Sequence, residues 1–393
     1  MFKWIKAELV FTPEVSDAQE ILVVGDQILA VGNDLLDLLS GDAHVEEIDA
    51  GPGSVLVPGF IDNHVHIIGG GGEGGYHTRV PEIQLTDITT CGVTTVIGVL
   101  GTDDVTRHLE SLLAKARGLE AEGISAFILT GSYSLPTPTL TGSIKRDLLL
   151  IDKVLGAGEI AISDHRASKA SFQALKDAAV GVRLGGMLSG KGGILQLHVG
   201  DDAEGLGPVK RLLEERVLPR HQILPTHVNR TKDLFAEALE YVRDGGQIDL
   251  TAFDFPNKRA LTAVEAVQQL LAEDLSLENV TMSSDSNGSL PEVDDAGRIL
   301  GLRQAKMSVM TKEFCSLIAD VGLEWSQALP LVTSNPARLF GLSHKGNLAA
   351  GMDADITIFQ GAHLDVAHVM AKGQWLVRNQ QPVVTGTFET NPF

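Results

Sequence analysis

The stretch VLVPGFIDNHVHIIGGGGEGG, residues 55–75, leads from an apolar run into two histidines and a glycine-rich segment. His64 and His66 are two positions apart, so on a β-strand both side chains point to the same face. Two imidazoles on one face can hold a divalent metal ion, whereas a hydrogen-bonded core pair is the ordinary alternative. The glycines that follow allow the backbone to approach a ligand closely. The stretch therefore predicts a strand that ends at a ligand site.

Apolar runs of strand length recur along the chain, and amphipathic helical patterns separate most of them. Residues 105–123 and 231–246 are two such helical patterns, and the second ends in the glycines typical of a helix C-terminus. Repeated units of a strand and then a helix predict an α/β fold, a TIM-like (β/α)8 barrel. The eight runs are residues 55–62, 93–100, 124–131, 159–163, 194–199, 222–228, 247–253 and 280–285.

The two ends of the chain carry short strands and turns instead. Residues 21–32, ILVVGDQILAVG, predict a β-hairpin with the Gly-Asp pair near its turn. The C-terminal end has a similar pattern. We predict a small β domain built from residues 1–58 and 345–393 together, with the (β/α)8 barrel over residues 59–344.

The composition of the chain limits the classes of molecule that we expect it to bind. The 393 residues are 44% hydrophobic and 21% charged, which is an ordinary globular mixture. The net charge of −20 opposes phosphate backbones and anionic lipids, so we expect neither nucleic-acid nor membrane partners. The start of the chain lacks the apolar region of a signal peptide. Two cysteines in a chain of this length suit a reducing compartment, so we expect a cytoplasmic protein.

Three further candidate ligands stand at the ends of predicted barrel strands, where this fold carries its chemistry. His198 ends the fifth run, His227 the sixth and Asp285 the eighth. Taken singly, each histidine could be a satisfied polar tip, and Asp285 could form an Asx turn. Because the barrel brings these strand ends together, they and the His-x-His pair predict a metal site.

Glu159 begins the fourth run, in GAGEIAISDHR, residues 156–166. Buried carboxylates are rare unless they are paired or bound to a metal ion. A solvent-facing strand end is the ordinary explanation. Its place in the strand order favours a contribution to the same site.

Longer motifs resemble the isoaspartyl dipeptidase family of the amidohydrolase superfamily over nearly the whole chain. This resemblance implies hydrolysis of β-aspartyl dipeptides by a metal-bridged hydroxide, with two divalent metal ions, usually zinc, as cofactors. It also implies a homo-oligomer. The motifs are residues 58–75 (PGFIDNHVHIIGGGGEGG), 96–103 (VIGVLGTD), 111–133 (SLLAKARGLEAEGISAFILTGSY), 161–166 (AISDHR), 224–230 (LPTHVNR) and 283–289 (SSDSNGS).

The resemblance also implies roles for single residues. A carboxylated lysine normally bridges the two metals in this family, and Glu159 stands at that position. Tyr133 matches the residue that donates to the developing oxyanion, and Asp285 the general base that then acts as acid. The implied metal ligands are His64, His66 and Asp285 for the more buried ion, and His198 and His227 for the second.

Glu159 is the main departure from the family pattern. Its side chain is roughly 3–4 Å shorter than a carboxylated lysine, by ordinary bond lengths. It could bridge both metals after a shift of the backbone or a neighbour, contact one metal, or contact neither. We expect direct bridging, because the site needs an anionic oxygen and glutamate supplies it without carbon dioxide. The nearest lysine, Lys153, is expected in the preceding helical stretch and is a poor substitute.

The implied substrate carries one ammonium group and two carboxylates. Glu73 suits the ammonium group, and Arg166 and Arg230 suit carboxylates, although structural salt bridges are the alternative for each arginine. Further contacts carried over by resemblance are Gly71, Thr102 and Ser289.

Two other functions remain open at this point. A dihydroorotase-like cyclic amidase would share the metal ligands but would not need Glu73 together with both arginines. A non-catalytic assembly protein on the same fold usually loses metal histidines, and all four are present here.

Overall fold

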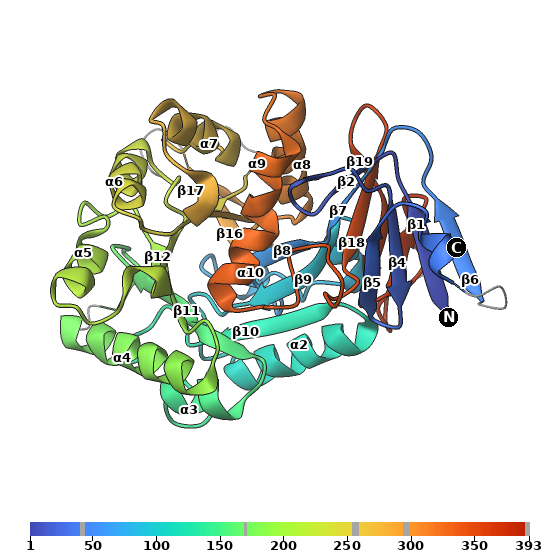
Figure 1. The fold of residues 1–393 in the computed structure, drawn as a ribbon. Helices are drawn as coiled ribbons and strands as arrows, with labels where there is room; N and C mark the ends of the chain where they lie inside the picture. The colour runs from blue at the N-terminus through green and yellow to red at the C-terminus, as the bar shows by residue number, and fades with distance from the viewer. Residues whose placement is uncertain (40–43, 169–170, 254–258, 294–298, 390–393) are drawn as a thin grey trace.

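The centre of the molecule is a barrel of parallel strands with helices around it (Figure 1). Strands β8 to β13 are hydrogen-bonded in sequence order, and β14 pairs with β15. β13 lies beside β14 and β15 lies beside β8, where the backbone NH of His66 donates to the carbonyl of Ser286 at 2.9 Å. The barrel is therefore closed, which confirms the predicted fold class. The computed structural model describes residues 1–39, 44–168, 171–253, 259–293 and 299–389.

The barrel strands follow the predicted apolar runs, with shifted bounds. The run over 55–62 divides at Gly59, because residues up to Pro58 pair with the chain-end strands and the barrel begins at Phe60. The fourth strand starts before Glu159, at Val154. The barrel strands are β8 (Phe60–Val65), β9 (Val93–Gly98), β10 (Ser125–Thr130), β11 (Val154–Ile162), β12 (Ile194–Val199), β13 (Ile223–Thr226), β14 (Ile248–Thr251) and β15 (Val280–Ser283).

The surrounding helices bury one apolar stripe each. In α2, Leu109, Leu112, Ala116 and Leu119 recur at helical spacing and are buried. The helix predicted over 231–246 spans Lys232–Arg243 and begins with an N-cap hydrogen bond. The helices are α1 (Leu85–Thr89), α2 (Leu109–Glu122), α3 (Ile144–Leu150), α4 (Phe172–Ser189), α5 (Gly207–Glu214), α6 (Lys232–Arg243), α7 (Ala263–Ala272), α8 (Ser308–Ala319), α9 (Trp325–Ala328) and α10 (Ser334–Phe340).

Both chain ends build the β region at the right of Figure 1, as expected. One sheet has the order β5-β4-β1-β6, and the other, β21-β20-β19-β18-β7-β2-β3, combines strands from both ends. The predicted hairpin forms between β4 and β5. The domain limits themselves remain a prediction. These strands are β1 (Phe2–Lys6), β2 (Leu9–Phe11), β3 (Val15–Ser16), β4 (Glu20–Val24), β5 (Gln27–Gly32), β6 (Val45–Asp49), β7 (Ser54–Pro58), β18 (Ile356–Gln360), β19 (Asp365–Ala371), β20 (Gln374–Arg378) and β21 (Gln381–Pro382).

An aromatic group joins the barrel to the β region. Phe60 at the start of β8 packs edge-on against Phe314 of α8, with ring centroids 4.8 Å apart, and lies 5.7 Å from Phe359 of β18. All three rings are fully buried. The hydrophobic core therefore continues from the barrel into the chain-end sheet.

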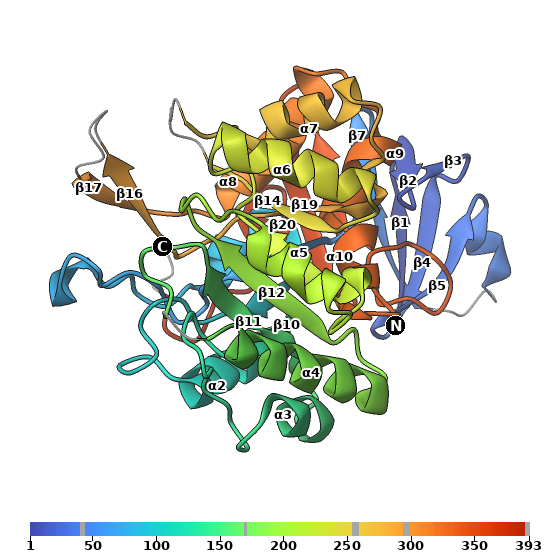
Figure 2. The same ribbon diagram turned by 90° about the vertical axis from the view of Figure 1, so that its left-hand side faces the viewer.

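Irregular segments lie over the carboxyl ends of the barrel strands. The hairpin of β16 (Ser289–Val293) and β17 (Ile299–Gln304) follows β15 and projects from the barrel in Figure 2. The part of the chain that the structure describes has no helix long and apolar enough to cross a membrane. Short 3-10 helices are η1 (Leu35–Leu38), η2 (Tyr76–Thr78), η3 (Arg220–Gln222), η4 (Leu277–Asn279) and η5 (Leu329–Val332).

Candidate metal centre

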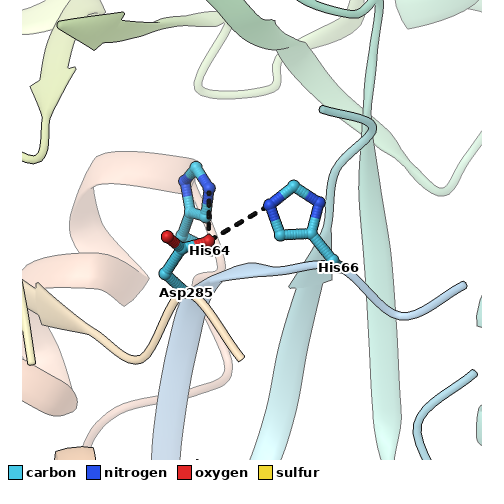
Figure 3. A group of neighbouring side chains, drawn as sticks. All are labelled: His64, His66 and Asp285. Carbon is cyan, nitrogen blue, oxygen red and sulfur yellow. Dashed lines mark ion pairs between the residues drawn. The ribbon is translucent and has the colours of Figure 1, made fainter. Parts of the chain in front are cut away.

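His64 and His66 lie at the carboxyl end of β8 and face Asp285, which follows β15 (Figure 3). Asp285 Oδ1 is 3.6 Å from His64 Nε2 and 3.1 Å from His66 Nε2. Asp285 has a positive φ of 50°, which is uncommon for a residue other than glycine. Such backbone outliers cluster at functional sites.

Glu159 lies between the two groups of histidines. Its Oε1 is 3.4 Å from His66 Nε2 and its Oε2 is 3.5 Å from His64 Nε2. The same Oε2 is 3.0 Å from His198 Nδ1 and 3.3 Å from His227 Nε2. The structure therefore brings together all six residues expected to bind metal, with the glutamate at the centre.

The backbone of β11 is irregular at the position of Glu159. Its pairing with β12 shifts register between Ala157 and Ile160, so the regular alternation of side chains is broken there. A Cβ at Gly158 would lie 2.9 Å from the carbonyl oxygen of Gln196, so the backbone runs close to its neighbour. A bulge of this kind re-aims a side chain. Lys153 lies in the turn before β11 and pairs with Glu120 at 2.5 Å, outside any helix and away from the site.

His198 and His227 form the second group of histidines, and another side chain contacts the ring nitrogen of each that does not face Glu159. His227 has a φ of 62°, and its Nδ1 lies 2.7 Å from Thr251 Oγ1, which leaves Nε2 facing Glu159. His198 Nε2 lies 3.0 Å from Asp164 Oδ2, which leaves Nδ1 facing Glu159. Partners of this kind fix the orientation of a ligand imidazole.

The donor atoms fit a divalent metal ion. Three of them, His64 Nε2, Glu159 Oε1 and Asp285 Oδ1, are buried and have no hydrogen-bond partner in the described chain. The separations of 3.0–3.6 Å between imidazole nitrogens and carboxylate oxygens resemble those of ligands around one ion. A tetrahedral zinc ion with bonds of about 2.0–2.1 Å separates its ligand atoms by about 3.3 Å. The opposite ring nitrogens, His64 Nδ1 and His66 Nδ1, likewise have no hydrogen-bond partner among the described residues.

The charges of the site are strongly coupled. Burial raises the pKa of Glu159, but the charge of His64 and bonds from the histidines outweigh it and hold that pKa well below its usual range. Burial lowers the pKa of His64, yet the charges of Glu159 and Asp285 raise it to about 9. Burial and the charge of His198 lower the pKa of His227 to about 3, against the bond to Glu159. Buried carboxylates that remain ionised make this a cation site.

Tyr133 is buried beside His198. Its hydroxyl is 2.8 Å from His198 Nδ1, and its ring is stacked under the guanidinium of Arg166 at 5.3 Å. Burial and the charge of Glu159 raise the pKa of Tyr133 well above its ordinary value. The phenol therefore keeps its proton and can donate a hydrogen bond.

Asp164 connects the metal donors to the two arginines. Its carboxylate makes a two-bond pair with Arg166, through Nε and Nη2 at 2.9 Å each, and lies 3.5 Å from Arg230 Nη1. Its side chain is only 1% exposed. Burial opposes its ionisation, but the bonds from His198 and Arg166 lower the pKa of Asp164 far below its usual range.

The glycine-rich segment brings the remaining residues together. Glu73 Oε1 accepts a hydrogen bond from Thr102 Oγ1 at 3.2 Å and lies 3.7 Å from Arg166 Nη1. A Cβ at Gly71 would lie 2.6 Å from the Thr78 carbonyl and 3.2 Å from Ser289 Cβ, and φ at Gly71 is 73°. Glycine is therefore required there.

Sequence reasoning missed three supporting residues: Asp164, Asp62 and Arg107. Asp164 stands in the motif SDHR at a strand end, which was a usable signal. Asp62 is fully buried and accepts hydrogen bonds from Ser284, and burial raises its pKa to about 7. The role of Arg107 had no local signal, because the three carbonyls that its guanidinium holds lie 27–39 residues away in the sequence.

Comparison with known proteins agrees with this geometry. Residues 55–376 match the amidohydrolase family. The chain belongs to the amidohydrolase family. As an amidohydrolase it is a metal-dependent hydrolase, and its candidate donor groups are those described above.

Solved structures narrow the relationship. The crystal structure of a β-aspartyl dipeptidase from Fervidobacterium islandicum AW-1, in complex with β-Asp-Leu, is 42% identical; the match covers 97% of this chain and 98% of that one, with a TM-score of 0.89. A dihydropyrimidinase from Brevibacillus agri NCHU1002 is 19% identical over 98% and 97% of the two chains, with a TM-score of 0.67, and so shares the fold. A deacetylase from Brucella anthropi is 24% identical over 382 residues, 92% of this chain and 85% of that protein.

Proposed function

We propose that this amidohydrolase hydrolyses β-aspartyl dipeptides. One observation carries the proposal: Glu73, Arg166 and Arg230 form a charged group directly beside the metal donors, linked to them through Asp164. A β-aspartyl dipeptide has one ammonium group and two carboxylates, so its charges complement these three side chains. The dipeptide complex of the F. islandicum enzyme supports the same substrate class.

The cofactors in this proposal are two divalent metal ions, with zinc as the expected element. One would be held by His64, His66 and Asp285, and the other by His198 and His227, with Glu159 between them. When bound, such ions polarise the scissile carbonyl and supply an activated water. Imidazole and carboxylate donors at this spacing support zinc.

Asp285 and Tyr133 are the proposed catalytic residues. Asp285 is an ionised carboxylate whose Oδ1 lies within the donor cluster, 3.1 Å from His66 Nε2, so it could take a proton from the attacking water and return it to the leaving amine. The protonated hydroxyl of Tyr133 can donate to the oxygen that becomes negative in the transition state. Both groups border the same donor cluster.

Substrate recognition is assigned to the charged group. Glu73 would bind the ammonium group, and Arg166 and Arg230 the carboxylates. The Nη1 group of Arg166 makes no hydrogen bond to Asp164 and lies 3.7 Å from Glu73 Oε1, so the two proposed recognition groups adjoin one another. Gly71, Thr102 and Ser289 are proposed to line the same side, through the close approach of the glycine-rich segment.

A substrate panel tests the function. The purified protein, supplied with zinc, would be assayed with β-Asp-Leu, its isomer α-Asp-Leu, and dihydroorotate. We expect rapid hydrolysis of β-Asp-Leu only, because the charged group fixes the position of the β-carbonyl. Turnover of dihydroorotate alone would contradict the proposal and favour a cyclic amidase.

We further propose a cytoplasmic homo-oligomer. Several large apolar side chains on α3 and α4 are exposed, and apolar patches of this kind mark interaction surfaces. Light scattering with mass determination tests this, and a monomer at micromolar concentration would contradict it. The exposed side chains are Leu149, Leu150, Val180, Leu184, Met187 and Leu188.

A further inference from the structure

The glycine-rich segment raises the question of how Glu73 is held in place. Residues 69–75 contain six glycines and Glu73, so the segment has almost no side chains of its own to pack. None of the residues 71–78 is buried, and Tyr76 is 87% exposed. Glycine-rich backbone has a large conformational freedom that folding must overcome. Core packing therefore does not fix the position of the Glu73 carboxylate.

Arg107 supplies the missing support. Its guanidinium donates from Nε to the carbonyl of Ile68 at 3.2 Å, from Nη1 to that of Gly71 at 3.3 Å, and from Nη2 to that of Val80 at 2.9 Å. These acceptors stand on both arms of the segment, which leaves one strand end and returns at residue 80. The side chain of Arg107 therefore connects both arms of the segment by hydrogen bonds.

The site of Arg107 is built for a guanidinium group. Only 6% of the residue is exposed, and its charge is balanced by Asp103, 3.5 Å away. Asp103 is itself held by Arg79 at 2.6 Å and by the backbone NH of Thr106 at 2.8 Å. A buried charge is costly unless it is paired and hydrogen-bonded, and here both conditions are met. The planar, forked donors of arginine fit three separate carbonyls, which the single ammonium of lysine cannot do in the same geometry.

The loop that carries Arg107 also carries Thr102, which donates to Glu73. Arg107 and Thr102 therefore join the same two loops, which follow β8 and β9. Through these ties the position of Glu73 depends on the loop after β9 as well as on its own.

We propose that Arg107 is a positioning residue that holds the segment 68–80 so that Glu73 meets the ammonium group of the substrate. This inference rests on the proposed function, because it assigns Arg107 a part in recognising the free amine of a β-aspartyl dipeptide. Arg107 does not touch the substrate; it acts through Glu73.

The first test measures the loop directly, without substrate. Hydrogen–deuterium exchange of the amides over residues 69–75 is compared in the wild type, Arg107→Met, and the control Arg117→Met. Arg117 is an arginine of α2 with a 59% exposed side chain that pairs with Asp152 at the surface. We expect faster exchange over 69–75 in Arg107→Met alone, with exchange in the barrel strands unchanged. Equal exchange in all three proteins would overturn the proposal.

The second test separates positioning of Glu73 from general support of the fold. The wild type and variants are assayed with β-Asp-Leu and with N-succinyl-leucine, which has the same scissile amide but lacks the ammonium group. We expect Arg107→Met to raise KM for β-Asp-Leu and to reduce the preference for it by at least about tenfold, because a site built for a polar group discriminates strongly only when that group is well placed. Glu73→Gln should do the same, and the double variant should show little further loss.

The outcomes are distinct. Free guanidinium ion should partly restore the preference in Arg107→Ala, whose short side chain leaves room for it, and the substitution Arg107→Lys should not preserve the preference. Equal losses on both substrates, or additive effects of the two substitutions, would overturn the proposal and leave Arg107 a brace of the fold. A wild type that leaves β-Asp-Leu intact would contradict the proposed function instead, and the exchange experiment would still decide whether Arg107 holds the loop.

Discussion

Two buried clusters of charge in this molecule differ in how completely they are satisfied. In the first, near the chain-end sheets, Lys345 Nζ lies 2.7 Å from Asp353 Oδ2 and 2.6 Å from Asp355 Oδ2. Burial lowers the pKa of Lys345, but the two carboxylates outweigh it and raise that pKa above its usual value. The cluster is complete without any added group.

The second cluster is the group of histidines and carboxylates at the barrel rim. It is more deeply buried than the first, in which the Asp353 side chain is 25% exposed, yet atoms such as His64 Nε2 and Glu159 Oε1 have no hydrogen-bond partner among the described residues. An unpaired buried polar atom costs about 1–3 kcal/mol, and more when it is charged. The comparison teaches that the Lys345 cluster stabilises the fold by itself, whereas the rim cluster is arranged for a cation that completes it.

Removal of metal should have the largest effect. Prolonged dialysis against a chelator is expected to abolish hydrolysis of β-Asp-Leu and to lower the melting temperature, since a ligand at about 1,000 times its Kd stabilises a protein by about 4 kcal/mol. Zinc should restore both. Elemental analysis would confirm that the dialysed protein is free of metal. Full activity of that protein would contradict the claim that the rim cluster, unlike the Lys345 cluster, needs a cation.

Glu159→Gln is the next largest prediction. It keeps the shape of the side chain and removes the charge, so activity should fall by more than the roughly 100-fold cost of losing a group that merely supports a ligand. Unchanged kcat/KM would contradict the assignment of Glu159.

Lys345→Met should give the opposite pattern. Breaking a buried ion pair from one side costs about 3–5 kcal/mol, so the free energy of unfolding should fall by that order while activity per folded molecule stays the same. Lys372→Met is the matched control, since its ammonium is 36% exposed and lies 3.6 Å from Glu120. Urea unfolding monitored by fluorescence measures both variants, and a loss of activity without a loss of stability would reverse the comparison.

The smallest effect is expected at the partly exposed Asp103. Burial raises its pKa, but hydrogen bonds from Thr106, Val105 and Arg79 outweigh it and lower the pKa of Asp103 from 3.8 to about 2. Its contribution to stability is therefore present above pH 4 and lost as the pH falls toward 2. Asp103→Asn should remove that part of the pH dependence of the free energy of unfolding. Because solvent screens this partly exposed carboxylate, the change should be less than about 1 kcal/mol. If the free energy of unfolding of the wild type and of Asp103→Asn fell identically between pH 4 and pH 2, Asp103 would not make this contribution.

The barrel and the candidate metal ligands could be predicted from the sequence because both depend on local patterns. Apolar runs, helical spacing and the His-x-His pair are readable over a few residues, and strand order then placed His198, His227 and Asp285 at one rim. The resemblance added the roles.

Other features depend on contacts between distant segments, so no local pattern announces them. The carbonyls that Arg107 holds are 27–39 residues away, and Asp164 meets Arg230 and His198 only because three strands end together. The register shift at Glu159 likewise depends on pairing with β12.

Metal content tests the central claim most directly. Wild type and Glu159→Gln would be purified in buffer freed of carbon dioxide, loaded with zinc, desalted, and analysed for zinc per chain, with and without bicarbonate. We expect two zinc ions per wild-type chain in both buffers and fewer in Glu159→Gln. Wild type that holds a second ion only with bicarbonate, or a variant that holds as much zinc as the wild type, would contradict direct bridging by Glu159.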